Sequence, residues 1–217
     1  MKGIFNGHIS LVINAIYLPN NKIASCSSDK TVIFWDSENF QQETIFKSNE
    51  QPNSLLYLKQ KNILFIGYRN SFVNGYTNIY DAFSPHKLIS TIKDIHSWKI
   101  KELDDGNVAI SQDQPPRIYI INSSNFHIMK QITDVHIIRN SGSLCVLNYK
   151  SFLYLWGGYF CQISNYGGNN YGIEYQTIES KKELSGDAGI VVIENGKYFI
   201  TNTRNMSHSI NIYECIY

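Results

Sequence analysis

Net charge of either sign is nearly absent from this chain. Its 217 residues include 19 Lys and Arg against 18 Asp and Glu, which leaves a formal charge of +1. Such a small charge lacks the long-range field that draws proteins to nucleic acid or to anionic lipid. We therefore expect no nucleic-acid partner, although a basic rim can still form locally.

Cysteine is scarce and poorly spaced for cross-linking or metal binding. The four cysteines show no C-x-x-C spacing, and a chain of this size needs no disulfide framework. The histidines also lack the short spacings of zinc sites. We expect no metal, no cofactor and a reducing, cytoplasmic location. The cysteines are Cys26, Cys145, Cys161 and Cys215.

Long hydrophobic runs are missing as well, because no apolar stretch approaches the roughly 18 residues that cross a bilayer. The run from Ile9 to Leu18 is interrupted by Ser10 and Asn14, and no small-residue cleavage site follows it. We expect neither export nor membrane insertion. Hydrophobic residues still make up 43% of the chain, which is enough for a core. One domain over residues 1-217 is the simplest expectation.

Against these absences, the segment from Gly7 to Asp36 carries five marks in a fixed order. Those marks are Gly7-His8, Val12-Ile13, the run Ile23 to Ser28, the turn Asp29-Lys30, and the run Thr31 to Asp36 that ends in Trp-Asp. Two short strands joined by a polar turn, opened by Gly-His and closed by Trp-Asp, resemble one unit of the WD-repeat β-propeller family.

Four later segments of the chain resemble the Trp35 end of this segment more weakly. They follow at spacings of 45, 41, 35 and 57 residues, of which the first two match the family's repeat of about 40 to 45 residues. The residues that correspond to Trp35 in these segments are Tyr80, Ile121, Trp156 and Tyr213. The predicted repeats are 1-36, 37-81, 82-122, 123-156 and 157-217. The last contains a segment rich in Gly, Asn and Tyr at 157-172, which we expect to be a mobile insertion; a recognition loop is the alternative.

We call Trp35 and its four counterparts the anchors of the five units. The residues one and three positions before each anchor lie on the same side of an alternating pattern with a period of two, as Phe34 and Val32 do before Trp35. Such alternation is typical of strands, and no helical period competes with it. We predict an all-β fold, a β-propeller of about five four-stranded antiparallel blades. It forms either a small closed ring or part of a larger propeller. Gly3 to Asn6 is in phase to serve as an outer strand of the last blade.

The resemblance also implies a structural role for the polar marks of the first unit. In the family, a His, a Ser, an Asp and a Trp form a hydrogen-bonded chain that ties the layers of a blade together. The matching residues here are His8, Ser25 or Ser27, Asp29 and Trp35. Ser, His and Asp are also the residues of a nucleophilic triad, but no G-x-S-x-G motif accompanies them. We expect a structural network and no catalytic residue.

The turns between second and third strands are basic in four of the five predicted units. In a propeller these turns emerge on one face, which suggests a binding surface for an acidic or phosphorylated peptide. The alternative is that exposed turns simply tolerate Lys and Arg. The candidate partner-binding residues are Lys30, Tyr68, Arg69, Tyr149, Lys150 and Arg204.

Two classes of function agree with these features. The resemblance implies a noncatalytic scaffold that binds other proteins, as part of a complex. The alternative is a carbohydrate-binding or carbohydrate-active five-bladed propeller, which needs paired acids or a ring of aromatic residues around the axis. The acids that could line an axis, Glu102, Asp104 and Asp105, cluster in one unit and do not recur. We therefore expect the scaffold and no enzyme activity.

Overall fold

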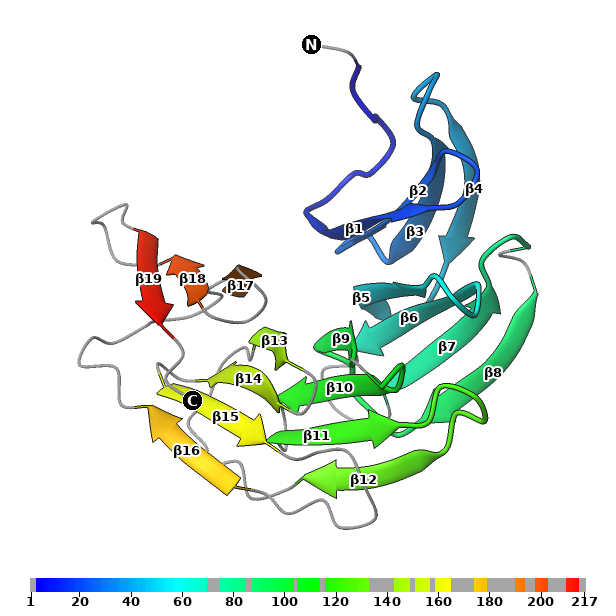
Figure 1. The fold of residues 1–217 in the computed structure, drawn as a ribbon. Coiled ribbons are helices and arrows are strands. Elements are labelled where there is room, and N and C mark those ends of the chain that lie inside the picture. The colour runs from blue at the N-terminus through cyan, green and yellow to red at the C-terminus, as the bar shows by residue number, and fades with distance from the viewer. Residues whose placement is uncertain are drawn as a thin grey trace. The chain divides into compact units, whose positions relative to one another are not determined.

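The computed structural model describes most of the first 132 residues and a series of strands beyond them (Figure 1). The chain divides into two compact units, residues 1–100 and 101–217, which are described separately. The described ranges are 3–69, 75–84, 87–103, 105–113, 116–132, 143–148, 151–156, 159–164, 174–178, 190–193, 198–202 and 210–214.

The first sheet is an antiparallel meander of four strands. Its strands are β1 (Val12–Leu18), β2 (Lys22–Ser27), β3 (Thr31–Asp36) and β4 (Gln42–Lys47), hydrogen-bonded in that order. Positive φ values at the tight turns fall on Asn20, Asn21 and Lys30. Asn tolerates this left-handed conformation well, whereas Lys does so only at a cost. The polar turns predicted from the sequence therefore separate the strands.

The second sheet repeats the same order. Its strands are β5 (Gln51–Leu58), β6 (Ile63–Arg69), β7 (Tyr76–Asp81) and β8 (Leu88–Lys93). Within residues 1–100, β1, β2 and β3 pack against β5. The core of this unit consists of Leu18, Ala24, Cys26, Val32, Phe34, Leu55, Leu64, Ile66, Tyr68 and Ala82.

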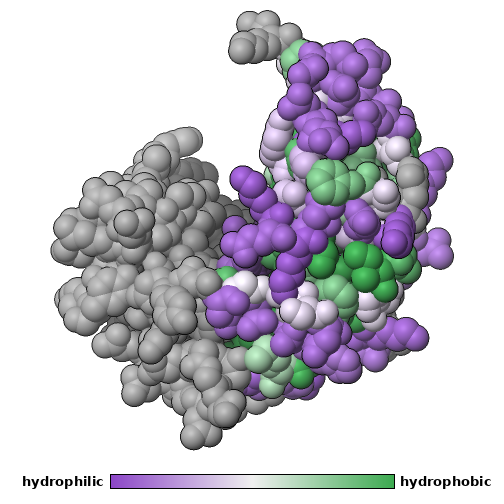
Figure 2. Space-filling view, turned by 45° about the vertical axis from the view of Figure 1, so that its right-hand side comes forward, coloured by the Kyte–Doolittle hydropathy of each residue, from purple (hydrophilic) through white to green (hydrophobic). Residues whose placement is uncertain are grey.

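In the first sheet, the middle strand β2 is buried on both faces, whereas the outer strand β4 is half exposed. Ala24 to Ser27 of β2 are all buried, and their small side chains suit a strand covered on two sides. Strand β4 instead alternates between exposed and half-buried residues. Hydrophilic residues cover most of the described surface in view, and hydrophobic residues gather in smaller patches (Figure 2). Two outer strands begin with an exposed hydrophobic residue, one with Leu88 and the other with Ile128.

Burial in β2 makes Cys26 chemically inert. The side chain is 0% exposed, and burial raises the pKa of its thiol to about 12. Since the thiolate is the nucleophile, iodoacetamide at about pH 8 should leave Cys26 unmodified in the folded protein and alkylate it in urea. Mass spectrometry of the peptide that contains Cys26 measures both states. Equal labelling with and without urea would contradict the burial of this strand.

The remaining described strands form three further sheets. The third contains β9 (Lys99–Glu102), β10 (Val108–Asp113), β11 (Pro116–Ile121) and β12 (Ile128–Ile132). The fourth contains β13 (Ser143–Asn148), β14 (Ser151–Trp156), β15 (Tyr159–Ser164) and β16 (Glu174–Ile178). The fifth contains β17 (Ile190–Ile193), β18 (Tyr198–Asn202) and β19 (Ile210–Glu214).

The first three sheets share one irregularity at the anchor residues. The pairing of third and fourth strands shifts register at Phe34/Trp35, at Ile79/Tyr80 and at Ile120/Ile121. An Asp or Asn follows each shift, and its side-chain oxygen accepts hydrogen bonds from the N–H groups two and three residues later. These residues are Asp36, Asp81 and Asn122. The Asp of Trp-Asp is therefore the cap of a recurring turn.

The fourth sheet differs from the predicted repeats. Strand β15 lies inside 157-172, where a mobile insertion was predicted, and Trp156 ends the second strand of its sheet instead of the third. Aromatic and β-branched residues such as Tyr159, Phe160 and Ile163 favour a strand despite the neighbouring glycines. In the structure, the third strands of the five sheets end at Asp36, Asp81, Ile121, Ser164 and Glu214. The spacings between these ends are 45, 40, 43 and 50 residues.

The segment before the first sheet is not a strand. Gly3 to Asn6 was predicted as an outer strand, but it has no regular secondary structure. The Phe5 ring instead packs against Trp35 and Phe40, with ring centroids 5.4 Å and 5.2 Å away. Aromatic packing on the first sheet therefore positions this segment. Within the described residues, no helix is long and apolar enough to span a bilayer.

Candidate functional site

A chain of hydrogen bonds crosses the first sheet from Trp35 to Asp29. The Trp35 indole N–H donates to Ser25 Oγ at 2.7 Å, and Ser25 Oγ lies 2.7 Å from His8 Nε2. His8 Nδ1 lies 3.0 Å from Asp29 Oδ2. One tautomer satisfies every group: Ser25 O–H donates to Nε2, and Nδ1–H donates to the carboxylate. The structure therefore brings together four of the five residues predicted for this network.

Ser27, the alternative to Ser25, has a separate role. Its hydroxyl oxygen accepts a hydrogen bond from the Asp29 N–H at 3.1 Å, which stabilises the turn between β2 and β3. Gly7 is required by a close approach instead: a Cβ there would lie 2.8 Å from the Trp35 ring and 2.9 Å from Gln42 Oε1. Gly7, Ser27 and the four residues of the network thus all have structural roles in the first sheet.

Asp29 is the most heavily bonded residue of the network. Its carboxylate accepts hydrogen bonds from the Ile9 N–H at 3.0 Å, from the Thr31 N–H at 2.9 Å and from the Thr31 hydroxyl at 2.5 Å. Burial raises the pKa of Asp29, but the hydrogen bonds from Thr31, Ile9 and His8 together outweigh burial and lower that pKa from 3.8 to about 2. Asp29 is therefore a carboxylate at neutral pH.

The Ser25–His8–Asp29 distances resemble those of a nucleophilic triad, but the surroundings differ. Ser25 is 5% exposed, and its oxygen already accepts the Trp35 N–H. A nucleophilic serine needs an accessible oxygen and nearby donors for an oxyanion. This arrangement instead satisfies buried polar groups, which supports a structural role.

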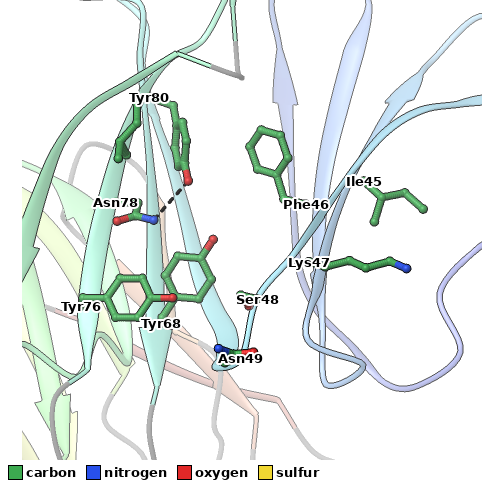
Figure 3. Close-up of a pocket in the computed structure, with 10 residues that line it drawn as sticks. Ile45, Phe46, Lys47, Ser48, Asn49, Tyr68, Tyr76, Asn78 and Tyr80 are labelled. Carbon is green, nitrogen blue, oxygen red and sulfur yellow. Dashed lines mark hydrogen bonds between the residues drawn. The ribbon is translucent and has the colours of Figure 1, made fainter.

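A pocket of about 700 Å³ opens between the first two sheets, inside the unit 1–100 (Figure 3). One wall is β4 and the residues directly after it; the other is formed by β6, β7 and the start of β8. Its lining residues are Ile45, Phe46, Lys47, Ser48, Asn49, Tyr68, Tyr76, Asn78, Tyr80 and Leu88. A volume in the range of about 300–1,000 Å³ is typical of ligand sites.

Four of the ten lining residues of this pocket are aromatic. Tyr68 and Tyr76 stack with centroids 4.5 Å apart, and Phe46 packs on Tyr80 at 5.3 Å. Tyr76, Asn78 and Tyr80 are alternate residues of β7, so all three face the same side of the second sheet. Burial raises the pKa of the Tyr68 and Tyr76 hydroxyls, so both remain protonated at neutral pH.

Asn78 connects this wall to the outer strand. Its amide oxygen accepts a hydrogen bond from the Thr91 hydroxyl at 2.9 Å, and its Nδ2 donates to the Tyr80 hydroxyl oxygen at 3.1 Å. With its oxygen engaged, Asn78 presents donors to the pocket. The Tyr80 hydroxyl accepts from Asn78 and also interacts with the Tyr68 hydroxyl.

The predicted partner-binding residues separate into different surroundings. Lys30 adjoins the pocket, because its ammonium donates to the Asn49 carbonyl at 2.9 Å. Tyr68 lines the pocket but is only 3% exposed. Arg69 instead packs on the Trp98 ring, with its Cζ 4.5 Å from the centroid. Tyr149, Lys150 and Arg204 lie outside the described residues.

The sequence analysis missed Phe46, Tyr76 and Asn78, and it took Tyr80 only as an anchor. The available signal was the alternation of polar-aromatic residues in β7. Alternation within one strand does not show whether the neighbouring sheet leaves a space opposite that face of the strand. No group of His, Cys, Asp or Glu suited to a metal ion occurs among the described side chains.

Comparison with known proteins places the chain by fold. No family model matches it, and no curated protein matches its sequence. Its structure is similar to the WD40 β-propeller domain of Doa1, with a TM-score of 0.74 and 16% identity over 98% of this chain and 68% of that chain. It is also similar to U3-55K, with a TM-score of 0.71 and 11% identity over 97% of this chain and 63% of that chain.

These identities show the fold alone, and the chain spans about two thirds of the length of either structure. The antiparallel four-stranded sheets, in meander order, agree with that likeness. The prediction of five blades in the whole protein stays a prediction, as does the choice between a closed ring and part of a larger one. The chain has the all-β fold of WD40-like β-propellers.

Proposed function

We propose that this chain is a noncatalytic protein-interaction scaffold, and that the pocket between its first two sheets holds a segment of the partner. The likeness to WD40 propellers supports an interaction role at a coarse level. The single observation that carries the proposal is the open pocket between β4 and β7, where aromatic rings and amide donors face a space of about 700 Å³. Aromatic residues are enriched at protein interfaces because they combine large area with few rotamers.

The partner segment in this proposal is acidic or phosphorylated. Lys30 supplies the charge at the end of the pocket, where its ammonium contacts a neutral carbonyl at Asn49. A carboxylate or phosphate offers this ammonium a stronger, charge-assisted hydrogen bond than a carbonyl does. Glu43 of β4 does not offset this charge, because it already pairs with Lys22 at 2.6 Å.

Charge reversal at Lys30 tests this proposal. Lys30→Glu should lower recovery of the partner several-fold in affinity capture from native cells, with a steeper loss as salt is raised for the wild type than for the variant. The matched control is Lys59→Glu, which makes the same charge change in the exposed turn between β5 and β6. Arg69 is less suitable, because its reversal also removes the contact with Trp98. Equal recovery with both Lys variants would overturn the acidic segment.

The proposal has three further parts. The protein has no catalytic activity, it lies in the cytoplasm, and it belongs to a complex. Burial of Ser25 and its bond to Trp35 support the first part. The scarce and widely spaced cysteines of the sequence support the second part. Fluorescence microscopy of the tagged protein tests the location, and size-exclusion chromatography of a cell extract tests membership of a complex.

A further inference from the structure

The outer edge of β4 presents main-chain groups that no described strand pairs. Strand β4 is last in the order of the first sheet, so one of its edges has no neighbour there. The Ser48 N–H donates to the Lys30 carbonyl at 3.1 Å, which makes these two residues a hydrogen-bonded pair of the β3–β4 ladder. Pairs alternate along an antiparallel ladder. The N–H and C=O of Ile45 and Lys47 therefore point away from β3.

This edge is also a wall of the pocket. Phe46 points from β4 toward Tyr80, whereas the Ile45 and Lys47 side chains point away from the tyrosines (Figure 3). Both residues nevertheless line the pocket. Their contribution to the pocket is therefore main chain, and the unpaired groups of β4 lie beside the aromatic wall of β7.

The geometry points to strand addition: a partner segment in extended conformation pairs with Ile45 and Lys47 of β4 and places an aromatic side chain in the pocket. This inference rests on the proposed function and adds the mode of binding. In such recognition the main chain supplies affinity, and a pocket for an alternate side chain supplies specificity.

An aromatic side chain fits what surrounds the pocket. The half-buried rings of Tyr76 and Tyr80 offer faces and edges for offset or edge-to-face packing, which is worth more than burial alone. A polar tip such as a tyrosine hydroxyl would lie near the polar groups of Asn78 and Tyr80. Because β4 and β7 bound the pocket on two sides, it suits side chains of an extended segment and not a globular surface.

Linear random peptides displayed on phage, selected on the intact protein, provide the probe. We expect enriched sequences to carry an aromatic residue at one fixed position and acidic residues toward one end. A synthetic copy of an enriched peptide is then N-methylated at one position at a time. Methyl groups on alternate residues should weaken binding by about tenfold or more, and those between them by less than about twofold, because only alternate N–H groups face β4.

Two protein variants locate the site. Tyr80→Ala should weaken peptide binding by about tenfold, whereas the matched change Tyr17→Ala, at an exposed position of β1, should leave it unchanged. Lys47→Pro removes an outward N–H without removing a ladder bond and should also weaken binding. Since the N-methyl series alters only the peptide, it remains decisive if a variant unfolds.

The outcomes separate the two proposals. Peptides that bind regardless of the N-methyl position, or no enriched peptide at all, would overturn strand addition. Peptides that respond to N-methylation but bind equally well to Lys30→Glu would overturn the acidic segment and keep strand addition. Neutral glycans that bind on an array and are lost with Tyr80→Ala would overturn both, in favour of carbohydrate recognition.

Discussion

Replacement of Trp35 by alanine should lower the free energy of unfolding by about 3 to 5 kcal/mol, the range for removal of a buried aromatic side chain. Trp35 is 2% exposed and packs against Phe5 at 5.4 Å and His8 at 6.0 Å. The change also leaves Ser25 Oγ without the indole donor. Urea unfolding followed by circular dichroism measures the loss.

Trp35→Phe is the matched control, because it keeps one six-membered aromatic ring and removes the pyrrole part of the indole, including its N–H. It should cost about 1 to 3 kcal/mol, the usual penalty for leaving a buried polar group unsatisfied. The difference between the two variants then measures packing. Equal losses for alanine and phenylalanine would show that the hydrogen bond, and not the ring, stabilises this sheet.

Replacement of Asp29 by alanine should cost about 1 to 3 kcal/mol, because several donors, most of them half-buried, lose their acceptor. The donors are the Ile9 N–H, the Thr31 N–H and hydroxyl, and the His8 ring. The Asp29 side chain is 4% exposed, so water replaces few of these bonds. Thermal unfolding compares the variant with Asp36→Ala, which removes an exposed turn cap and should have a smaller effect. An unchanged melting temperature for Asp29→Ala would contradict the role of this network.

Acid should weaken the fold through the same carboxylate. The pKa of Asp29 is lowered from 3.8 to about 2 in the folded protein, so its contribution is present above about pH 4. That contribution is lost as pH falls from about 4 toward 2, because the unfolded chain binds the proton first. Asp29→Asn should therefore flatten the loss of stability over this interval. A variant with the same slope as the wild type would assign the acid sensitivity to other groups.

Local pattern was sufficient for most strands and for the first network. Period-two alternation and polar turns predicted the middle and third strands of the first sheet, and the marks of the WD-repeat family named the residues that now lie within hydrogen-bonding distance. The choice between Ser25 and Ser27 required the structure. The two hydroxyls lie on the same face of β2, and only the three-dimensional register shows which one meets the indole.

The same pattern failed where composition masked strand propensity. Glycine and asparagine in 157-172 suggested a mobile insertion, yet β15 forms there and pairs with both of its neighbours. Strand stability depends on cross-strand partners, which a local window does not contain. Gly3 to Asn6 also lacks the predicted strand, and its Phe5 ring packs on Trp35 instead.

The sequence by itself determined the class of fold and the residues that hold the first sheet together, since alternation, turns and capping act over a few neighbouring residues. Only the tertiary structure decided which side chains share a surface. It placed Lys30 beside the pocket and Arg69 on Trp98, although both belong to basic turns of the sequence. The pocket exists because β4 of the first sheet faces β7 of the second. The two strands are distant in the sequence, since Lys47 at the end of β4 and Tyr76 at the start of β7 are 29 residues apart. Packing between sheets is a long-range property, and no local pattern encodes it.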